Sequence, residues 1–286
     1  MSDLFQLTGR NVIVTGAGGY RLRMLPRLLV VSVGTQIALL LAKAGANLLL
    51  SDASAEALCS LKETFEMHGP QQGMVLYKIC DVAREDEVES LVKRFDEHGG
   101  VDVMFNNAGV FPSSDGDAVE VSQEAWDLTY NVNIKGTWHG CKHAVLSMRR
   151  HGKTKGSVIN TSSIVGLIGS ATAQLAYTTS KGAIIAMTRE LAIVHAREGI
   201  RFNALCPGPL NTPLMQDYLG AESARRARRE VHLPQGRFGE PIEQAAVALF
   251  LASDASSFVN AQELVVDGGL TKVGGPSTPF RVQDLF

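Results

Sequence analysis

The sequence predicts an α/β protein with one doubly wound parallel sheet and helices on both of its faces. Short apolar runs alternate with amphipathic stretches through most of the 286 residues, as in repeated strand–helix–strand units. Runs such as NVIVT at residues 11–15 and VDVMF at residues 101–105 are almost wholly apolar, which is typical of strands buried on both faces. No internal repeat or Pro/Gly/Ser-rich linker divides the chain.

The local pattern predicts each element in turn. Val88, Leu91, Val92 and Phe95 recur at helical spacing, and short apolar runs indicate strands. The expected strands are residues 11–15, 47–51, 74–80, 101–106, 157–161, 201–206 and 263–266, and the expected helices are residues 34–44, 55–67, 84–98, 123–150, 177–197 and 244–252. We expect residues 1–271 to form one unit. Residues 272–286, rich in Gly and Pro, form either an arm against a neighbouring subunit or a loose end.

Composition limits the class of protein. The chain is 45% hydrophobic and 20% charged with a net charge of -2, so neither nucleic acid nor an anionic membrane is expected as a partner. Its four cysteines form no CxxC motif, and three lie in apolar stretches, which indicates buried free thiols and a cytoplasmic protein. The uncharged run at residues 28–42 follows several arginines, as the apolar region of a signal peptide follows its basic region. A strand and a glycine turn precede this run, so we do not expect it to be a signal peptide or a membrane anchor.

A glycine-rich turn follows the first expected strand. The strand ends in Thr15-Gly16-Ala17-Gly18-Gly19. Glycines at this place permit a tight turn and let backbone N–H groups approach a pyrophosphate at the start of the next helix. Such a cluster is a weak signal alone, and its position after a first strand strengthens it.

Polar residues end the next strands. Asp52 ends the second, where a carboxylate can accept both adenosine ribose hydroxyls and would repel a 2′-phosphate, so NAD is favoured over NADP. The alternative is an ordinary turn aspartate before a helix. Asp81 and Val82 end the third strand, within reach of an adenine. Asn106-Asn107-Ala108-Gly109 ends the fourth, where small residues leave room for a cofactor and Asn107 can brace neighbouring strands.

Further motifs occupy the second half of the chain. Tyr177-Thr178-Thr179-Ser180-Lys181 is a YxxxK pattern, and Ser163 lies upstream in Ser162-Ser163-Ile164-Val165-Gly166. Asn133-Ile134-Lys135-Gly136 and Pro207-Gly208-Pro209-Leu210-Asn211-Thr212 precede and follow these segments. With the glycine turn and the NNAG segment, their order and spacing from about Thr8 to Gly269 resemble the short-chain dehydrogenase/reductase family.

The resemblance implies a Rossmann-type fold and a catalytic set. Tyr177 would be the acid/base, Ser163 would bind the substrate oxygen, Lys181 would hold the nicotinamide ribose, and Asn133 would anchor a proton-relaying water. The implied cofactor residues are Gly16, Gly18, Gly34, Asp52, Asp81, Val82, Asn107, Ala108, Gly109, Tyr177, Lys181, Pro207, Gly208, Leu210 and Thr212. The family also implies a homodimer or homotetramer.

The chemistry of the pair follows from its spacing. Tyr177 and Lys181 are four residues apart and therefore share one helix face. A free tyrosine has a pKa near 10, and we expect the nearby ammonium to lower the pKa of Tyr177 so that it exchanges a proton with an alcohol or carbonyl. Ser162 competes with Ser163 for the serine role. The Ser-x-x-Gly match favours Ser163, although its spacing to Tyr177 is one residue longer than usual in the family.

Residues 20–31 interrupt the glycine motif. The family pattern TGxxxGxG begins at Thr15, but Tyr20 and Leu22 take the next two glycine places, and the pattern resumes at Ser32-Val33-Gly34. Removing residues 20–31 leaves TGAGGSVG, so we interpret them as an insertion, by hypothesis from a retained intron or a faulty gene model; an abundant transcript encoding them would refute that origin. Either the insertion loops out, or its apolar residues extend the helix backward through residues 28–33 and displace the dinucleotide.

Two other clusters have ordinary interpretations. His139 and His143 are four apart but lack the glutamate of HExxH and a third ligand, so no metal site is expected. Arg225, Arg226, Arg228 and Arg229 could meet an anionic substrate, or form a solvated face paired with Glu222 and Glu230.

The leading hypothesis is an NAD-dependent oxidoreductase that acts on a secondary alcohol or ketone. Two alternatives remain. One is a catalytically silent protein whose insertion disrupts cofactor binding. The other is an NADP-dependent 3-oxoacyl thioester reductase, which shares every motif named above.

Overall fold

The computed structural model describes residues 2–19, 32–69, 71–170, 172–213, 215–216, 226–227 and 230–273. The predicted insertion at residues 20–31, most of the arginine cluster and residues 274–286 of the expected tail lie outside them. Within the described chain, seven parallel strands form one sheet in the order β3-β2-β1-β4-β5-β6-β7. The predicted doubly wound sheet is confirmed.

The strands lie close to where the sequence predicted them. Their bounds are β1 Asn11–Thr15, β2 Asn47–Asp52, β3 Val75–Ile79, β4 Val103–Asn106, β5 Gly156–Thr161, β6 Ile200–Pro207 and β7 Glu263–Val266. The β1, β4 and β5 strands are almost completely buried, because helices cover both faces of the sheet. This double burial explains their continuous apolar runs.

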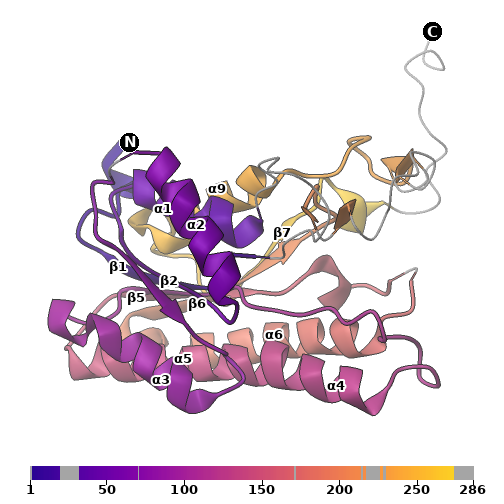
Figure 1. The fold of residues 1–286 in the computed structure, drawn as a ribbon, viewed down its shortest axis with the longest axis horizontal. Coiled ribbons are helices and arrows are strands. Elements are labelled where there is room, and N and C mark those ends of the chain that lie inside the picture. The colour runs from indigo at the N-terminus through magenta and orange to yellow at the C-terminus, as the bar shows by residue number, and fades with distance from the viewer. Residues whose placement is uncertain are drawn as a thin grey trace, which may run out of the picture.

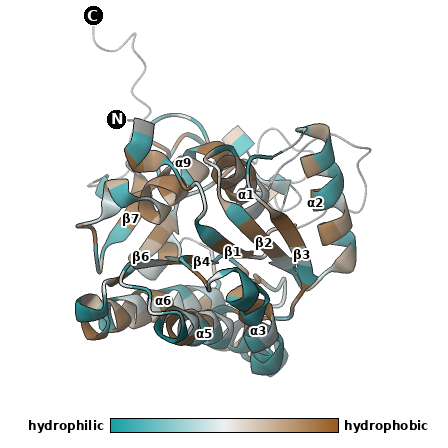
Figure 2. Ribbon diagram, turned by 90° about the vertical axis from the view of Figure 1, so that its left-hand side faces the viewer, coloured by the Kyte–Doolittle hydropathy of each residue, from teal (hydrophilic) through white to brown (hydrophobic). Residues whose placement is uncertain are grey.

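Two layers of helices enclose the sheet. The α1 (Val33–Lys43), α2 (Ala55–Met67) and α9 (Pro241–Ala252) helices cover one face, and α3 (Glu85–Val92), α4 (Gln123–Thr129), α5 (Gly136–Arg150) and α6 (Leu175–Val194) cover the other (Figure 1). Figure 2 shows the apolar strands between the two helix layers, with largely hydrophilic residues along α3 and largely hydrophobic residues along α1 and α9. Each layer has its own apolar core, one built on Leu41, Leu50 and Leu251 and one on Phe95, Met104 and Phe202.

Two expected helices are not continuous α-helices. Residues 84–98 form α3 as far as Val92 and then a 3-10 helix at Lys93–His98. Residues 123–150 contain α4 and α5 joined by a π-helical turn at Tyr130–Lys135. The continuous apolar periodicity hides such a turn, because it adds one residue without ending the helix. It carries the buried Asn133, and π-turns occur frequently at functional sites.

The sheet order places the predicted site. The strand order reverses between β1 and β4, and in open parallel sheets ligands bind beyond the carboxyl ends at such a switch point. The glycine turn after β1, the NNAG segment after β4 and the serine segment after β5 all follow this edge. Motifs that are far apart in sequence therefore lie at adjacent strand ends.

Candidate active site

The glycine turn closes tightly against neighbouring segments. Gly16 has a φ of 62°, and a Cβ on it would lie 2.7 Å from the Cα atom of Ala108. A Cβ on Gly34 would lie 2.4 Å from the Gly16 carbonyl oxygen. The Asn107 amide donates to the Thr15 and Gly16 carbonyls, both at 3.1 Å, which confirms its predicted bracing role. The turn, the start of α1 and the NNAG segment thus form one cradle that admits no side chain at either glycine.

The residues that flank the predicted insertion, Gly19 and Ser32, lie side by side. A Cβ on Gly19 would lie 2.1 Å from the Cβ atom of Ser32, so the chain leaves the turn and returns to it at neighbouring points. Ser32 has extended backbone angles and caps α1, its hydroxyl accepting from the Thr35 N–H at 3.1 Å. Because the helix begins at Val33, a helix running back through residue 32 is wrong. Ser32 and Gly34 therefore lie against Gly19 and Gly16, although twelve residues separate the two segments.

Asp52 contacts the turn directly. One of its carboxylate oxygens accepts from Gly18 N–H at 3.1 Å and Gly19 N–H at 3.2 Å, and the other from Ser54 N–H at 3.1 Å. Burial raises the pKa of Asp52, and these backbone hydrogen bonds oppose that rise. The carboxylate therefore lies at the mouth of the glycine turn, where a dinucleotide's adenosine ribose would lie.

The other predicted cofactor residues also follow strand ends. Val82 packs against the start of α5, where a Cβ on Gly136 would lie 2.6 Å from its Cγ2 atom. Asp81 accepts from the Ala83 N–H at 2.9 Å. After β6, Gly208 N–H donates to the Val266 carbonyl at 3.0 Å, and Leu210 forms an isolated bridge with Gly239. Pro207 ends β6 itself, and Thr212 N–H donates to the Leu210 carbonyl at 2.9 Å.

Tyr177 and Lys181 lie together in the first turns of α6. The Lys181 Nζ atom lies 5.3 Å from the centroid of the Tyr177 ring and donates to the Thr161 carbonyl at 2.9 Å. Lys181 is 4% exposed, and burial lowers its pKa to about 8. An ammonium has three donors, and in the described chain Thr161 is its one hydrogen-bond acceptor. Two donors remain for a ligand.

The predicted effect on the tyrosine is wrong for this structure. Burial raises the pKa of Tyr177 to about 12, and a hydrogen bond from Ser163 only partly opposes the rise. The ammonium lies over the ring and is itself enclosed, so loss of solvent around the phenol outweighs it. Tyr177 is therefore a phenol at neutral pH, which is the form that donates a proton to a carbonyl.

The structure separates the two candidate serines. The Ser162 hydroxyl is 2% exposed and donates to the Lys181 backbone carbonyl at 2.8 Å, so it joins β5 to α6. Ser163 hydrogen-bonds Tyr177 and begins the short 3-10 helix Ile164–Gly166. The longer spacing noted in the sequence does not prevent that contact, and Ser163 is the serine that faces the phenol.

Asn133 is fully buried beside the lysine. Its side chain accepts from Val110 N–H at 2.8 Å and donates to the Val110 carbonyl at 3.1 Å and to the Ser180 hydroxyl at 3.0 Å. A Cβ on Gly109 would lie 3.4 Å from Asn133 Oδ1 and 3.6 Å from Lys181 Nζ. The asparagine thus ties the π-turn, the NNAG segment and α6 together around the ammonium.

The two histidines have structural partners. His139 Nδ1 lies 2.9 Å from the Val82 carbonyl, and His143 Nε2 lies 3.2 Å from a Glu85 carboxylate oxygen. No group of three or more His, Cys, Asp or Glu side chains in the described chain could hold a metal ion. Of the arginine cluster, the structure describes Arg226, which pairs with Glu230 at 2.8 Å.

Sequence reasoning missed two residues at this site. The Asp115 carboxylate accepts from the N–H groups of Ala176 and Tyr177. The ring centroid of Phe111 lies 5.0 Å from that of Tyr177. Both come from the loop after the NNAG segment, and they meet α6 only through the fold. The polar run SSDGD at residues 113–117 predicts a loop, but nothing in it indicates that the loop contacts α6.

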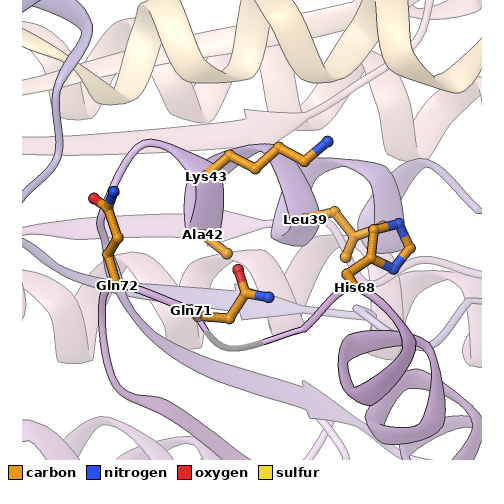
Figure 3. A pocket seen from close by; sticks show the side chains of 6 residues that line it. All are labelled: Leu39, Ala42, Lys43, His68, Gln71 and Gln72. Carbon is orange, nitrogen blue, oxygen red and sulfur yellow. The ribbon is translucent and has the colours of Figure 1, made fainter.

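One small cavity lies elsewhere. It has a volume of about 230 Å³ and is lined by residues from the ends of α1 and α2 and from the loop that follows α2 (Figure 3). They are Leu39, Ala42, Lys43, His68, Gln71 and Gln72. None is a predicted site residue. No helix among the described residues is long and apolar enough to cross a membrane.

The arrangement suits a nicotinamide dinucleotide. The backbone cradle excludes side chains at Gly16 and Gly34, Asp52 lies at its mouth, and the buried Lys181 ammonium has donors to spare. Near it, the buried hydroxyl of Thr161 makes no hydrogen bond to any described residue. A phenol, a serine hydroxyl and an ammonium lie together beside this cradle. These three groups can transfer a proton to or from the oxygen of an alcohol or ketone.

Known proteins share this fold and sequence. A family model described as Enoyl-(Acyl carrier protein) reductase matches residues 30–271. The chain is 35% identical to 2,5-dichloro-2,5-cyclohexadiene-1,4-diol dehydrogenase of Sphingobium indicum over 96% of this chain and 100% of that one. It is 36% identical to 3-oxoacyl-[acyl-carrier-protein] reductase FabG of Thermotoga maritima over 93% and 99% of the two chains.

A solved structure agrees. The gluconate 5-dehydrogenase of Burkholderia cenocepacia, in complex with NADP and tartrate, superposes with a TM-score of 0.81 and 30% identity over 95% of this chain and 99% of that one. These matches extend across both halves of the sheet. The chain belongs to the short-chain dehydrogenase/reductase family and is an oxidoreductase that acts on alcohol or ketone substrates.

Proposed function

We propose that the chain is an NAD-dependent dehydrogenase that moves hydride between nicotinamide and a secondary alcohol or ketone. The observation that carries the proposal is the contact of Tyr177 with Ser163 and with the buried Lys181 beside the glycine cradle. The cofactor supplies the hydride chemistry when bound. The protein's own contribution is to hold the substrate oxygen and to move one proton.

Each catalytic residue has a separate task. Ser163 donates a hydrogen bond to the substrate oxygen as negative charge develops on it. Tyr177 gives its phenolic proton to that oxygen in reduction and takes it back in oxidation. Lys181 holds the nicotinamide ribose and stabilises the phenolate that forms. Asn133 fixes the segments around the ammonium through its bonds to Val110 and Ser180.

The cofactor preference follows from Asp52. Its carboxylate accepts from the Gly18 and Gly19 N–H groups, and among the described residues its partners are backbone N–H groups. A 2′-phosphate there would meet the negative charge of this carboxylate, whereas two ribose hydroxyls would find an acceptor. These observations favour NAD. The NADP bound to the gluconate dehydrogenase supports the alternative, so both cofactors belong in the test.

Calorimetry of NAD+ and NADP+ on the full chain tests the cofactor, with a chain lacking residues 20–31 as the matched control. The proposal expects NAD+ to bind at least about tenfold more tightly. Equal binding by both chains shows that the insertion leaves the cradle intact. Binding by the shortened chain alone establishes the silent alternative for the full sequence.

Turnover tests the substrate class. Cyclic secondary alcohols are the first panel, because the diol dehydrogenase relative is named for a cyclohexadiene-diol. Acetoacetyl thioesters are the second, because the FabG relative is named for 3-oxoacyl carriers. Formation or loss of reduced nicotinamide is followed by absorbance. Faster turnover of the thioesters with NADPH would replace our proposal with the thioester reductase alternative.

Assembly and location are also proposals. Leu128, Trp138 and Leu146 are more than 40% exposed on α4 and α5, which supports a homodimer or homotetramer joined through these helices. Sedimentation velocity measures the mass; a monomer at micromolar concentration would refute it. Cys80, Cys141 and Cys206 are buried free thiols and Cys59 is an exposed one, which supports a reducing, cytoplasmic location.

A further inference from the structure

The loop after β4 contacts the first turn of α6. One Asp115 carboxylate oxygen accepts from Ala176 N–H at 3.0 Å, and the other accepts from Tyr177 N–H at 2.9 Å. The Gly116 carbonyl accepts from Leu175 N–H at 2.8 Å. Three successive N–H groups at the start of the helix thus have partners from a loop about 60 residues earlier in the chain.

These bonds replace an ordinary helix cap. The first N–H groups of a helix lack partners within it, and a side chain at the cap position normally supplies one. Gln174 occupies that position and makes no side-chain cap bond. The start of α6 is therefore fixed by tertiary contacts with Asp115 and Gly116, and its position depends on them.

The same loop also contacts the reactive ring. The Phe111 and Tyr177 ring centroids lie 5.0 Å apart at an interplanar angle of 59°. Tyr177 is the third residue of α6, so the N–H that Asp115 accepts belongs to the residue that carries the phenol. One loop holds this residue at its backbone and at its ring.

We propose that Asp115 is a positioning residue that sets the placement of the Tyr177 phenol against the substrate oxygen. This inference rests on the proposed role of Tyr177 as the acid/base. Asp115 does not touch the reacting atoms; it acts through the N–H groups of Ala176 and Tyr177, and one of its oxygens also accepts from Gly116 N–H in its own loop at 2.9 Å. Displacement of a reacting group by about 1 Å can slow a reaction about a hundredfold, so the effect falls on kcat.

Three variants test the proposal. Asp115→Ala removes both acceptors, and we expect kcat to fall about 30-fold while KM for the best alcohol of the cyclic panel stays within about threefold. Asp115→Asn keeps one acceptor oxygen and should retain more than about one fifth of wild-type kcat. Asp117→Ala is the matched control, since among the described residues the exposed Asp117 side chain accepts from Val119 and Glu120 N–H, both in its own turn. It should have wild-type kcat.

The outcomes separate positioning from general loosening. Values of kcat are normalised to sites titrated by NAD+. A kcat for Asp115→Ala within about twofold of wild type overturns the proposal. So does an equal loss in Asp117→Ala, or a fall in NAD+ affinity that parallels the loss of kcat. If Tyr177→Phe keeps full activity, the proposed function itself fails; if Tyr177→Phe is inactive and Asp115→Ala is normal, only this inference fails.

A second measurement needs no substrate. Hydrogen exchange of the amides at Ala176 and Tyr177 reports on the bonds directly. We expect exchange about tenfold faster in Asp115→Ala than in wild type or Asp117→Ala. Unchanged exchange would show that the carboxylate does not hold the helix start, and the proposal would be wrong.

Discussion

The two edges of the sheet treat polar groups differently. At the amino edge, the Asn11 side chain donates to the His98 and Gly100 carbonyls, both at 2.7 Å, and its N–H donates to Asp102 at 2.9 Å. Lys153 donates to the other Asp102 oxygen at 2.7 Å. Asp102 is 5% exposed, and this buried carboxylate has partners on both oxygens.

The carboxyl edge leaves comparable groups with fewer partners. Lys181 is equally buried but has one acceptor among the described residues, and the Thr161 hydroxyl has none. Burial lowers the pKa of Lys181 to about 8 and raises that of Tyr177 to about 12, so both shifts favour the uncharged side chain. The amino edge thus pairs its buried polar groups with one another, whereas the carboxyl edge holds desolvated polar groups that have hydrogen-bonding capacity to spare. Substitutions at the two edges should therefore have opposite consequences.

The largest expected effect is at the carboxyl edge. Tyr177→Phe removes the phenolic proton and should lower kcat about a thousandfold. The ring and its contact with Phe111 remain, so the midpoint of thermal unfolding should hardly change. Steady-state kinetics and calorimetry measure the two properties. A large loss of stability would show that the phenol hydroxyl is as structural as the groups of the amino edge.

At the amino edge, Asp102→Ala should reduce stability and spare function. It leaves the Asn11 N–H and the Lys153 ammonium without their acceptor, which should cost about 3 kcal/mol in the free energy of unfolding. Denaturant unfolding gives this value, and NAD+ titration gives the fraction of competent sites. Per competent site, kcat should equal that of wild type; a lower value would remove the distinction between the edges.

Lys181→Met should stabilise the ligand-free protein. The folded pKa of about 8 lies below the ordinary lysine value of 10.5, so the folded state disfavours the ammonium. This penalty is complete below pH 8 and disappears as pH rises to 10.5, because the unfolded state binds more protons in that window. After subtraction of the lost Thr161 bond, the gain at pH 7 should be about 2 kcal/mol.

Unfolding of wild type and Lys181→Met at pH 7 and pH 10 measures that gain. The difference between them should shrink as pH rises, and NAD+ affinity should fall at both values. A variant less stable than wild type at pH 7 would show that the lysine is satisfied in the folded state, as Lys153 is.

The smallest effect tests the cradle. A Cβ in Gly34→Ala meets the Gly16 carbonyl at 2.4 Å and Asn107 Nδ2 at 2.8 Å, so the variant should lose about 2 kcal/mol of stability and bind NAD+ more weakly. Gly182→Ala is the control. Its Cβ has one neighbour, at 3.7 Å, and should be neutral or stabilising within α6. Equal stability and equal NAD+ affinity of the two variants would show that the cradle can shift to accommodate a side chain at Gly34.

Much of this architecture is predictable from local pattern. The β1 strand, the β7 strand and α2 have the predicted bounds, because short apolar runs and helical spacing report burial directly. The motifs at strand ends came together because parallel strands share one carboxyl edge. The π-turn around Asn133 was not predictable, since one added residue barely disturbs helical periodicity.

Other features depend on contacts across the fold. The Asp115 cap joins residues 61 and 62 positions apart, and nothing near Gln174 indicates it. The direction of the Tyr177 pKa shift was wrong because spacing shows the neighbouring ammonium but not the depth of burial. Sequence thus identifies which groups a site contains, whereas their protonation depends on the packing around them.

The contact between Gly19 and Ser32 also makes this point of the chain a place for engineering. Two neighbouring ends can be joined by linkers of very different length, because closure entropy grows only slowly with length. A peptide tag, a fluorophore-bearing cysteine or a pair of new chain termini placed between them would lie within reach of the nucleotide cradle. We therefore expect a reporter placed between Gly19 and Ser32 to respond to dinucleotide binding while leaving β1 and α1 unchanged.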